Sequence, residues 1–358
     1  MNRKFSTFFM LTVLSCFVSI SLSAQKADLD KYWYYVQTKA LPSSPLPAGT
    51  HTFMVTSRGS SIANESVPNS SVIDQIAIAG FKRVEGKAHV NIAIDFGDLI
   101  ISGSKTESRK EETKDKNNVV TSTKYFYKKT ISYKMNITGK ATNESGAQLI
   151  NLNANNGEQS WSSSEFSKSS DADDYYRNSY NDIRRELARG LIGGYINTVN
   201  SNLNSNYGYP DIKTRDFVWI EAAKKHPEYA LQQENWLLLK AFIPTLQGNA
   251  AITQAQMDQI KPIIDYFQSV KGKYTSDEKS DKKMRYQAYF TLATIYIMLD
   301  DLEAAKKEAD GLIANDYDEK DGTKFLKEIE AIKKSFEVNQ VNSRHYFVDP
   351  EANTPPGK

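Results

Sequence analysis

Cysteine and histidine are scarce in this chain of 358 residues, which has one cysteine and four histidines. The histidines, His51, His89, His226 and His345, stand far apart in the sequence. None has a second histidine or a carboxylate at the spacing of a metal site. The sequence therefore predicts no metal site, and beyond Cys16 it offers no disulfide and no thiolate nucleophile.

An excess of charge of either sign is also lacking, since 45 basic residues face 43 acidic ones. Without Arg3 and Lys4, which belong to the N-terminal segment described below, the two counts are equal. A protein that binds nucleic acid needs a basic face. We therefore expect no nucleic-acid partner.

Motifs of the common enzyme classes are absent too. There is no phosphate-binding loop, no Gly-x-Ser-x-Gly elbow and no dinucleotide fingerprint. The paired acids Asp173-Asp174 and Asp300-Asp301 stand at expected helix starts and turns, where carboxylates favour capping. The sequence predicts no catalytic residue, no cofactor and no enzymatic activity. A hydrolase whose site is assembled from residues far apart in the sequence is the alternative, because such a site leaves no local motif.

The first residues form a targeting segment. Arg3 and Lys4 precede a mostly apolar run from residue 5 to residue 20, and small residues then lead to Ala24 and Gln25. This order is typical of a secretory signal peptide, and the run is short for a retained membrane anchor. We expect a signal peptide over residues 1–24, cleavage between Ala24 and Gln25, and a mature protein without cysteine. Stability must then come from the buried core alone.

Cys16 offers a second interpretation of the same segment. Val13-Leu14-Ser15-Cys16 resembles a lipoprotein box, whose cysteine is lipidated, although Leu14 is large for its position and the apolar run continues past Cys16. Lipidation would hold the protein peripherally on a membrane. Under either interpretation the chain is exported, and we expect the periplasm, with outer-membrane attachment or an extracellular location as alternatives.

Residues 25–205 alternate between strand-like and helix-like patterns and predict an α+β domain. The expected elements are strands over 32–36, 51–56, 81–84, 88–96 and around 149–152, a short helix from 69 to 80, and a long helix over 183–199. Gly190, Gly193 and Gly194 in the long helix predict close packing on a sheet. The aromatic run 32–36 favours a buried strand, with a sugar-stacking platform as the alternative.

A long β-ribbon is the most distinctive feature of this half. The segment 105–118 is almost wholly charged or polar, alternating strand patterns flank it, and Lys116-Asn117-Asn118 is a turn sequence. We expect the charge run 109–116 to be a solvated tip, with a docking finger for an anionic partner as the alternative. Asn155-Asn156-Gly157 predicts a further hairpin turn, and Asn200 to Pro210 the end of the domain.

The C-terminal part, residues 211–338, predicts an all-helical domain. Apolar residues stand at helical spacing around Phe217 to Ala223, over 236–242, 252–270 and 324–336, and in a helical hairpin over 282–315. Residues 339–358 are expected to form a disordered tail. A helical hairpin cannot bury its apolar stripe alone, so it implies neighbours of the same kind.

In that hairpin, Tyr289-x-x-Leu292-Ala293-x-x-Tyr296 followed by Ala305 resembles the tetratricopeptide repeat. Small Ala293 and Ala305 would let the two helices approach closely, with the tyrosines filling the space beside them. The resemblance implies a stack of helices whose concave surface binds a protein partner.

The N-terminal domain resembles the small α+β domains of periplasmic lipoproteins, of the type found in peptidoglycan-synthase activators and curli-secretion lipoproteins. The residues that carry the likeness are Gly80-Phe81, the strand 90–96 and the segment 157–161. The resemblance implies a non-enzymatic role in the cell envelope.

Together these features predict an exported, non-enzymatic adaptor or scaffold. The α+β domain would dock on one envelope component and the groove of the helical repeats would hold a protein partner. The alternatives are a regulatory cofactor of a cell-wall enzyme that acts through the α+β domain, and the hydrolase mentioned above.

Overall fold

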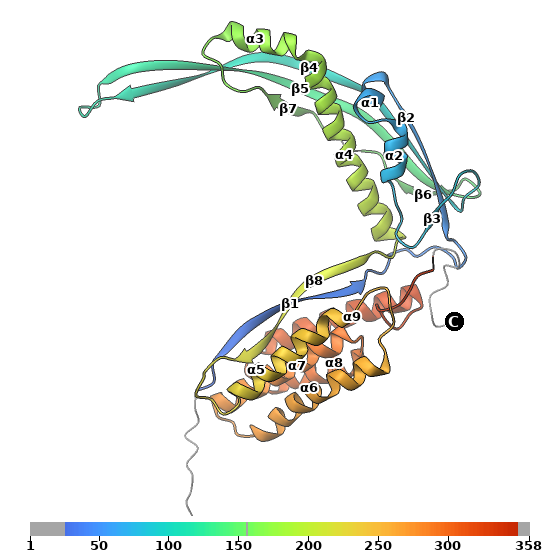
Figure 1. Cartoon of the computed structure of the whole chain (residues 1–358), viewed down its shortest axis with the longest axis vertical. Coiled ribbons are helices and arrows are strands. Elements are labelled where there is room, and N and C mark those ends of the chain that lie inside the picture. The colour runs from blue at the N-terminus through green and yellow to red at the C-terminus, as the bar shows by residue number, and fades with distance from the viewer. Residues whose placement is uncertain (1–25, 155–156, 350–358) are drawn as a thin grey trace, which may run out of the picture.

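The computed structural model describes residues 26–154 and 157–349. It is an elongated molecule of two units joined end to end (Figure 1). The α+β unit, residues 40–210, contains a six-stranded sheet with helices along one face. The helical unit contains α5 to α9 and a two-stranded sheet. The predicted fold class, an α+β region followed by helices, is confirmed.

The large sheet has the order β3-β2-β4-β5-β6, and β7 also pairs with β5. Its strands are β2 (Thr52–Gly59), β3 (Lys82–Arg83), β4 (Val90–Lys114), β5 (Val120–Asn143), β6 (Gln148–Asn151) and β7 (Gln159–Ser162). β2 is parallel to β3 and β4, and the other pairs are antiparallel. Ile92, Ile94 and Phe96 of β4 alternate with exposed or half-exposed residues, as expected for a sheet with one buried face.

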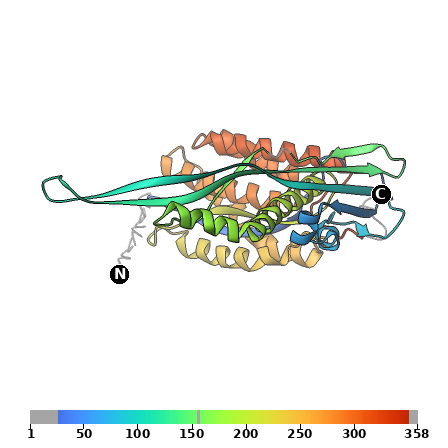
Figure 2. The same cartoon turned by 90° about the horizontal axis from the view of Figure 1, so that it is seen from above.

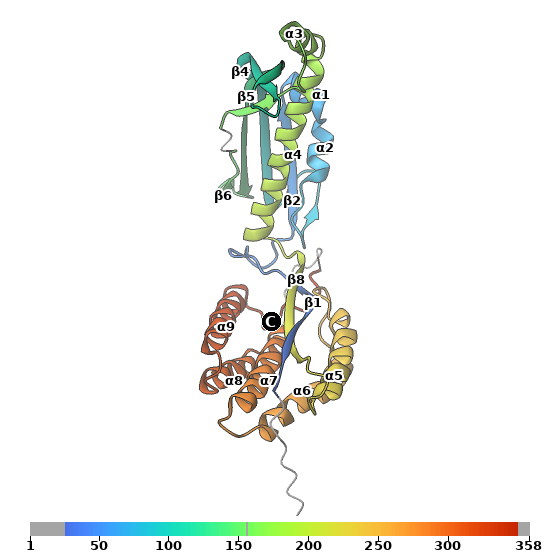
Figure 3. The same cartoon turned by 90° about the vertical axis from the view of Figure 1, so that its left-hand side faces the viewer.

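The buried face is covered by α1 (Ser61–Ser66), α2 (Asn69–Gln75) and α4 (Tyr180–Asn206), while α3 (Ser169–Asn178) lies against the ribbon (Figure 3). Ile192, Ile196 and Leu203 of α4 are buried in this core. Helix α1 was not predicted, and α2 ends at Gln75 rather than at Gly80.

The predicted ribbon is confirmed. β4 and β5 pair from Val90↔Asn143 to Lys114↔Val120, and residues 115–119 make the turn. Asn118 there has φ 64°, the left-handed conformation that asparagine tolerates. Beyond Gly103 the ribbon extends away from the body of the unit as an arm, whose first part still contacts β7 and α3 (Figure 2).

Two expectations for the α+β unit are wrong. Gly190, Gly193 and Gly194 do not pack on the sheet, because a β-carbon at each would meet nothing within 4 Å. The described residues of β6 and β7 do not pair with one another, because each pairs separately with β5. Asn155 and Asn156 of the expected hairpin turn lie outside the described residues.

The helical unit begins with a strand, not a helix. Residues Phe217 to Glu221, expected to be helical, belong to β8 (Asp211–Glu221), which pairs antiparallel with β1 (Leu29–Lys39) over its whole length. Val218 and Ile220 are fully buried on one face of β8. The partner strand lies about two hundred residues away in the sequence, so no local pattern could reveal the pairing.

The helices that follow agree with the expected ones. They are α5 (Tyr229–Phe242), the 3-10 turn η1 (Ile243–Thr245), α6 (Gln254–Lys273), α7 (Lys279–Met298), α8 (Leu302–Ala314) and α9 (Glu319–Asn339). α7 is the central helix, in contact with β8, α6, α8 and α9. We call the antiparallel pair of β1 and β8 the β1–β8 hairpin, although the two strands are not consecutive in the sequence. Figure 3 shows it running between α9 on one side and α5 on the other.

The residues after α9 connect the two units. In this strap, residues 340–349, the carbonyl oxygen of Arg344 accepts the Lys39 N–H at 2.8 Å, and His345 Nε2 lies 2.9 Å from the carbonyl oxygen of Met298. Tyr346 is 3% exposed and belongs to the core of the α+β unit. This part of the expected tail is therefore packed, and residues 350–358 lie outside the described residues.

Candidate binding surfaces

The β1–β8 hairpin occupies the concave side of the helical unit. Tyr34 and Val36 of β1 are buried in one core with α5, α6 and α7. Phe217 and Trp219 of β8 lie on the other side against Phe290 of α7, at 5.2 and 6.4 Å between ring centres. The concave groove that the repeat resemblance implied is thus filled by the chain itself and is not free for a partner.

Buried amides fix the hairpin in that position. Gln287 Nε2 of α7 donates to the Trp219 carbonyl at 2.6 Å, and Gln232 Nε2 of α5 donates to Gln287 Oε1 at 3.0 Å. The Glu221 N–H donates in turn to Gln232 Oε1 at 2.7 Å. Buried polar groups that satisfy one another in this way specify a unique packing.

One face of the hairpin combines aromatic rings with cations. It is open to solvent except at Phe217 and Trp219, which pack against Phe290. We call it the aromatic–cation face; its residues are Lys31, Trp33, Tyr35 and Gln37 of β1 and, opposite them, Trp219, Phe217, Arg215 and Lys213 of β8. Trp33 is 46% and Tyr35 53% exposed, although large rings usually lose most of their exposure on folding. The expected aromatic strand is therefore buried on one face only.

The three cations of this face lie over its rings. The Arg215 guanidinium carbon is 4.1 Å from the centre of the Trp33 ring, Lys213 Nζ is 5.0 Å from that of Tyr35, and Lys31 Nζ is 4.2 Å from that of Phe217. In the ranges that the structure describes, none of the three forms an ion pair with a carboxylate. The rings thus hold Lys213 and Arg215 in place without neutralising them, whereas the charge of Lys31 also acts on the Asp321 carboxylate of α9.

A cavity of about 350 Å³ adjoins this face, between the hairpin and η1. Trp33, Tyr35 and Pro244 give it apolar walls, and Lys213 and Lys240 add cationic groups. A concave apolar site with a few polar groups is the usual form of a binding pocket.

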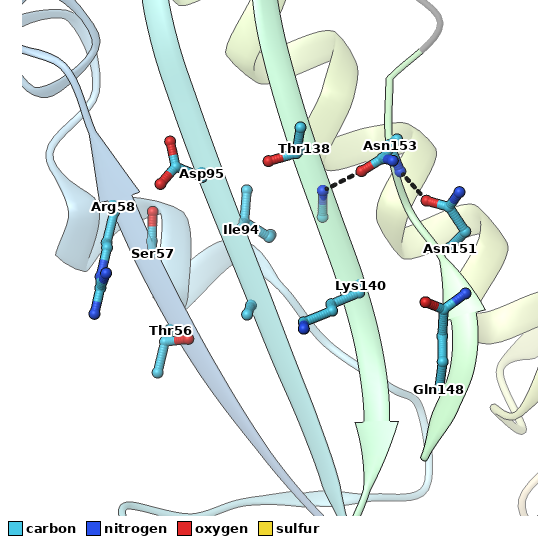
Figure 4. A pocket seen from close by; sticks show the side chains of 12 residues that line it. Thr56, Ser57, Arg58, Ile94, Asp95, Thr138, Lys140, Gln148, Asn151 and Asn153 are labelled. Atoms are coloured by element: carbon cyan, nitrogen blue, oxygen red, sulfur yellow. Dashed lines mark hydrogen bonds between the residues drawn. The ribbon is translucent and has the colours of Figure 1, made fainter. Parts of the chain in front are cut away.

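A second hollow, of about 590 Å³, lies on the open face of the large sheet (Figure 4). Ala93, whose side chain is small, lines it and pairs with Thr56 and Lys140, while Asp95 pairs with Arg58 and Thr138. The lining is polar and has no aromatic ring. It suits a polar group of a partner.

A larger hollow, of about 1040 Å³, runs along α4. Leu187, Leu191 and Tyr195 line it, and Gly190 and Gly194 add no side chain to it. The open space at these glycines is thus part of a groove.

The buried acid Glu228 has a structural role. Its carboxylate accepts hydrogen bonds from Lys273, from the Tyr266 hydroxyl at 2.8 Å and from the Tyr274 hydroxyl at 3.2 Å. Burial opposes ionisation, but the bonds from Lys273 and Tyr266 outweigh it, so that the pKa of Glu228 is lowered. These contacts join the start of α5 to the end of α6.

The structure brings two of the scattered histidines together. The rings of His51 and His89 are 4.9 Å apart, and His89 Nε2 lies 3.8 Å from Glu144 Oε1. Within residues 26–154 and 157–349, no group of three or more histidine, cysteine or acidic side chains could hold a metal ion. The same part of the chain contains no helix with the length and apolar character needed to cross a membrane.

The repeat-defining residues lie on α7 and α8. Ala293 and Ala305 are fully buried between these helices, and Tyr289 and Tyr296 are partly buried beside them. Leu292 is fully buried in the core that α7 shares with α5 and α6. The close pairing of two helices is as expected, while the tetratricopeptide family remains a prediction. Cys16, Ala24 and Gln25 lie outside the described residues, so the expected signal peptide and the alternative of lipidation remain predictions as well.

Comparison with known proteins gives no family. No family model and no curated protein matches the sequence. Among solved structures, a minor lipoprotein from Acinetobacter baumannii is similar with a TM-score of 0.20 and 6% identity, over 46% of this chain and 98% of that protein. Uncharacterized lipoprotein B from Nitrosomonas europaea is similar with a TM-score of 0.19 and 11% identity, over 47% and 97%. TM-scores this low carry no argument about this chain.

Proposed function

We propose that the mature chain is an exported binding protein of the cell envelope, without catalytic chemistry, and that it holds an acidic protein partner on the aromatic–cation face. The observation that carries the proposal is the position of Lys213 and Arg215, over rings rather than beside carboxylates. Cations held in this way need no rearrangement before they meet an anionic group, so binding loses little conformational entropy.

The chemistry of the face defines the partner. Tryptophan, tyrosine and arginine are the residues that contribute most to protein interfaces. Carboxylates of the partner would form charge-assisted hydrogen bonds with Arg215 and Lys213. An apolar side chain beside those carboxylates would fit the cavity at Trp33 and Pro244. The best fit is an acidic segment with an apolar anchor.

The adaptor role is the finer part of the proposal. The aromatic–cation face belongs to the helical unit, and the α+β unit lies at the other end of an elongated molecule (Figure 1). A second envelope component bound there would be joined to the first without competing for the same surface.

Site-specific crosslinking tests the proposal. A photo-crosslinking residue replaces Gln37, which lines the cavity, in the full chain expressed in its own cells. A control chain carries it at Val338, which is 44% exposed on α9. We expect one protein adduct from position 37 and none from position 338. K213E/R215E should abolish the adduct, whereas K333E/K334E, an equal change of charge on α9, should not. No adduct at position 37, or an adduct that survives K213E/R215E, would overturn the proposal.

A second candidate is regulation of a cell-wall enzyme through the α+β unit. The observation that favours it is the hollow of Figure 4, where the side chains of Arg58, Asp95 and Lys140 form no hydrogen bond or ion pair within the described residues. A crosslinker in place of Lys140 would then capture a cell-wall enzyme, and R58E would prevent it. Capture from position 37 alone would reject this candidate.

A further inference from the structure

The β4–β5 arm is held by the body of the protein only along its first part. Arg109 bonds Glu165 through two nitrogens, at 2.8 and 2.9 Å, and Lys129 Nζ lies 2.7 Å from Asp173 Oδ1 of α3. Arg109 also lies over the ring of Phe126, its partner in the opposite strand, at 4.7 Å. The arm is therefore fixed up to this pair.

Beyond the pair of Arg109 and Phe126, the arm is surrounded by solvent. Residues 110–125 are all exposed. At about 3.3 Å per residue, the five residues 110–114 carry the turn roughly 17 Å past the last fixed pair. Figures 1 and 2 show the end of the arm standing clear of all helices. An isolated two-stranded ribbon is only marginally stable in water, so a free end of this length suggests a function.

The cations of the fixed part, and Lys110 just beyond it, are neutralised. Arg109 bonds Glu111 as well as Glu165, Lys110 pairs with Glu112, and Glu107 lies 2.7 Å from Lys105 and 3.4 Å from Lys128. Positive and negative charges along this part thus pair with one another, as is usual on a solvated surface.

The end of the arm differs from this pattern. Lys114, Lys116 and Lys124 form no ion pair within the described residues. Lys124 stands opposite Glu111, whose carboxylate bonds Arg109 instead, at 3.0 Å. Asp115, the acid of the turn, accepts backbone N–H groups at 2.8 and 2.9 Å. Three lysines and one engaged carboxylate give the tip a positive charge.

The same tip carries the apolar residues of the turn. Val119 is 58% and Val120 44% exposed, directly after the left-handed Asn118. Exposed valines on a free strand favour aggregation and are avoided in solvated turns. We define the tip as Lys114, Lys116, Val119, Val120 and Lys124.

We propose that this tip binds the surface of a phospholipid bilayer that contains anionic lipids. Valines at the apex reach the boundary between headgroups and acyl chains, and the lysines around them meet the anionic headgroups. A second copy of the chain is the poorer fit, because two tips of the same charge repel one another. This contact does not involve the aromatic–cation face, so its test is independent of the function proposed above.

Sedimentation with vesicles tests the proposal on the mature full chain. The vesicles contain phosphatidylcholine with about a third phosphatidylglycerol, and pure phosphatidylcholine is the reference. Each lysine near an anionic surface is worth about five-fold in partitioning. K114E/K116E/K124E should therefore reduce binding by at least about a hundredfold. K327E/K333E/K334E, which makes the same change of charge on α9, should reduce it by less than about five-fold. Equal losses in the two variants would overturn the proposal.

A fluorescence measurement keeps the test independent of net charge. The tip is exposed, so V119W should leave the fold intact, and its emission should shift to the blue with anionic vesicles. No shift in V119W, while the protein still sediments with vesicles, would place the contact elsewhere and reject the tip. A dimer in solution that V119N/V120N abolishes, without vesicle binding, would identify a second copy as the occupant instead.

Discussion

The hydroxyl of Tyr195 on α4 occupies the space over Gly139 of β5 that a β-carbon at position 139 would need. The same hydroxyl donates to the Leu152 carbonyl at 2.9 Å, in the core of the α+β unit. Position 139 therefore requires glycine for steric reasons. The tyrosine joins α4 to the segment that follows β6.

Gly139→Ala should destabilise the protein by about 1–3 kcal/mol, because the methyl group must displace the buried hydroxyl. Urea unfolding at pH 7 measures the loss. Tyr195→Phe alone should cost about 1–2 kcal/mol, since it leaves the Leu152 carbonyl without its partner. The double variant should lose clearly less than the sum of the two, because the phenylalanine has no hydroxyl to displace. Additive losses would show that the two residues do not conflict.

Replacing the glycines of α4 should have the opposite effect. Gly190, Gly193 and Gly194 are helical, and a β-carbon at each meets only open space. Alanine at each position should raise the free energy of unfolding by about 0.5–1 kcal/mol, mainly by reducing the freedom of the unfolded chain. Thermal or urea unfolding of the single variants checks this. Gly139→Ala, where space is lacking, is the matched control, and a destabilised Gly194→Ala would mean that the groove along α4 is narrower than the structure shows.

These glycines also show what a sequence can and cannot reveal. Local alternation was sufficient for the arm, because the two strands are neighbours and the turn residues lie between them. It was insufficient for β8, whose helical interpretation used Val218 and Ile220 without knowledge of β1. The aromatic run 32–36 was recognised as a strand, but the cations over its rings come from β8, and only the pairing brings them together. Three glycines in one helix are equally compatible with close packing on a sheet and with an open groove, so the sequence alone does not distinguish the two.

Two acidic residues beside the hairpin should make stability depend on pH. Burial raises the pKa of Asp216, despite bonds from the Phe217 N–H and the Tyr34 hydroxyl. Burial, and then the charge of Asp216, raise the pKa of Glu328 on α9, while Arg344 opposes the shift. A raised folded pKa means that ionisation costs the folded state free energy. The contribution of these two groups is therefore most favourable below about pH 4 and is lost as the pH rises through their raised values.

Glu328→Gln should consequently stabilise the protein at pH 7 and have little effect near pH 4. The gain should stay under about 1 kcal/mol, because the side chain is only partly covered and the solvent that reaches it screens its charge. Urea unfolding at both pH values measures it. Glu330→Gln removes the same charge from the same helix and serves as the control. A loss of stability at pH 7, or the same gain at both pH values, would show that Asp216 and Glu328 do not repel one another.

One buried ion pair should hold the strap in its packed position. Arg344 Nε lies 2.7 Å from Asp300 Oδ1, and Nη2 of the same arginine donates to the Ile297 carbonyl at 2.6 Å. The Asp300 side chain is only 2% exposed, so Arg344→Met would leave its charge buried without a cation. We expect a loss of about 3 kcal/mol. The exposed pair of Lys306 and Asp310 is the control, and Lys306→Met should cost less than about 0.5 kcal/mol.

The same variant should change the shape of the molecule as well as its stability. Arg344 precedes Tyr346, which is buried in the core of the α+β unit, so a strap released at Asp300 no longer holds the two units end to end. Small-angle X-ray scattering of Arg344→Met, under conditions where the protein remains folded, should show a wider range of inter-unit distances than Lys306→Met. Identical scattering curves for the two variants would mean that β1, β8 and the segments that follow them align the units without the strap.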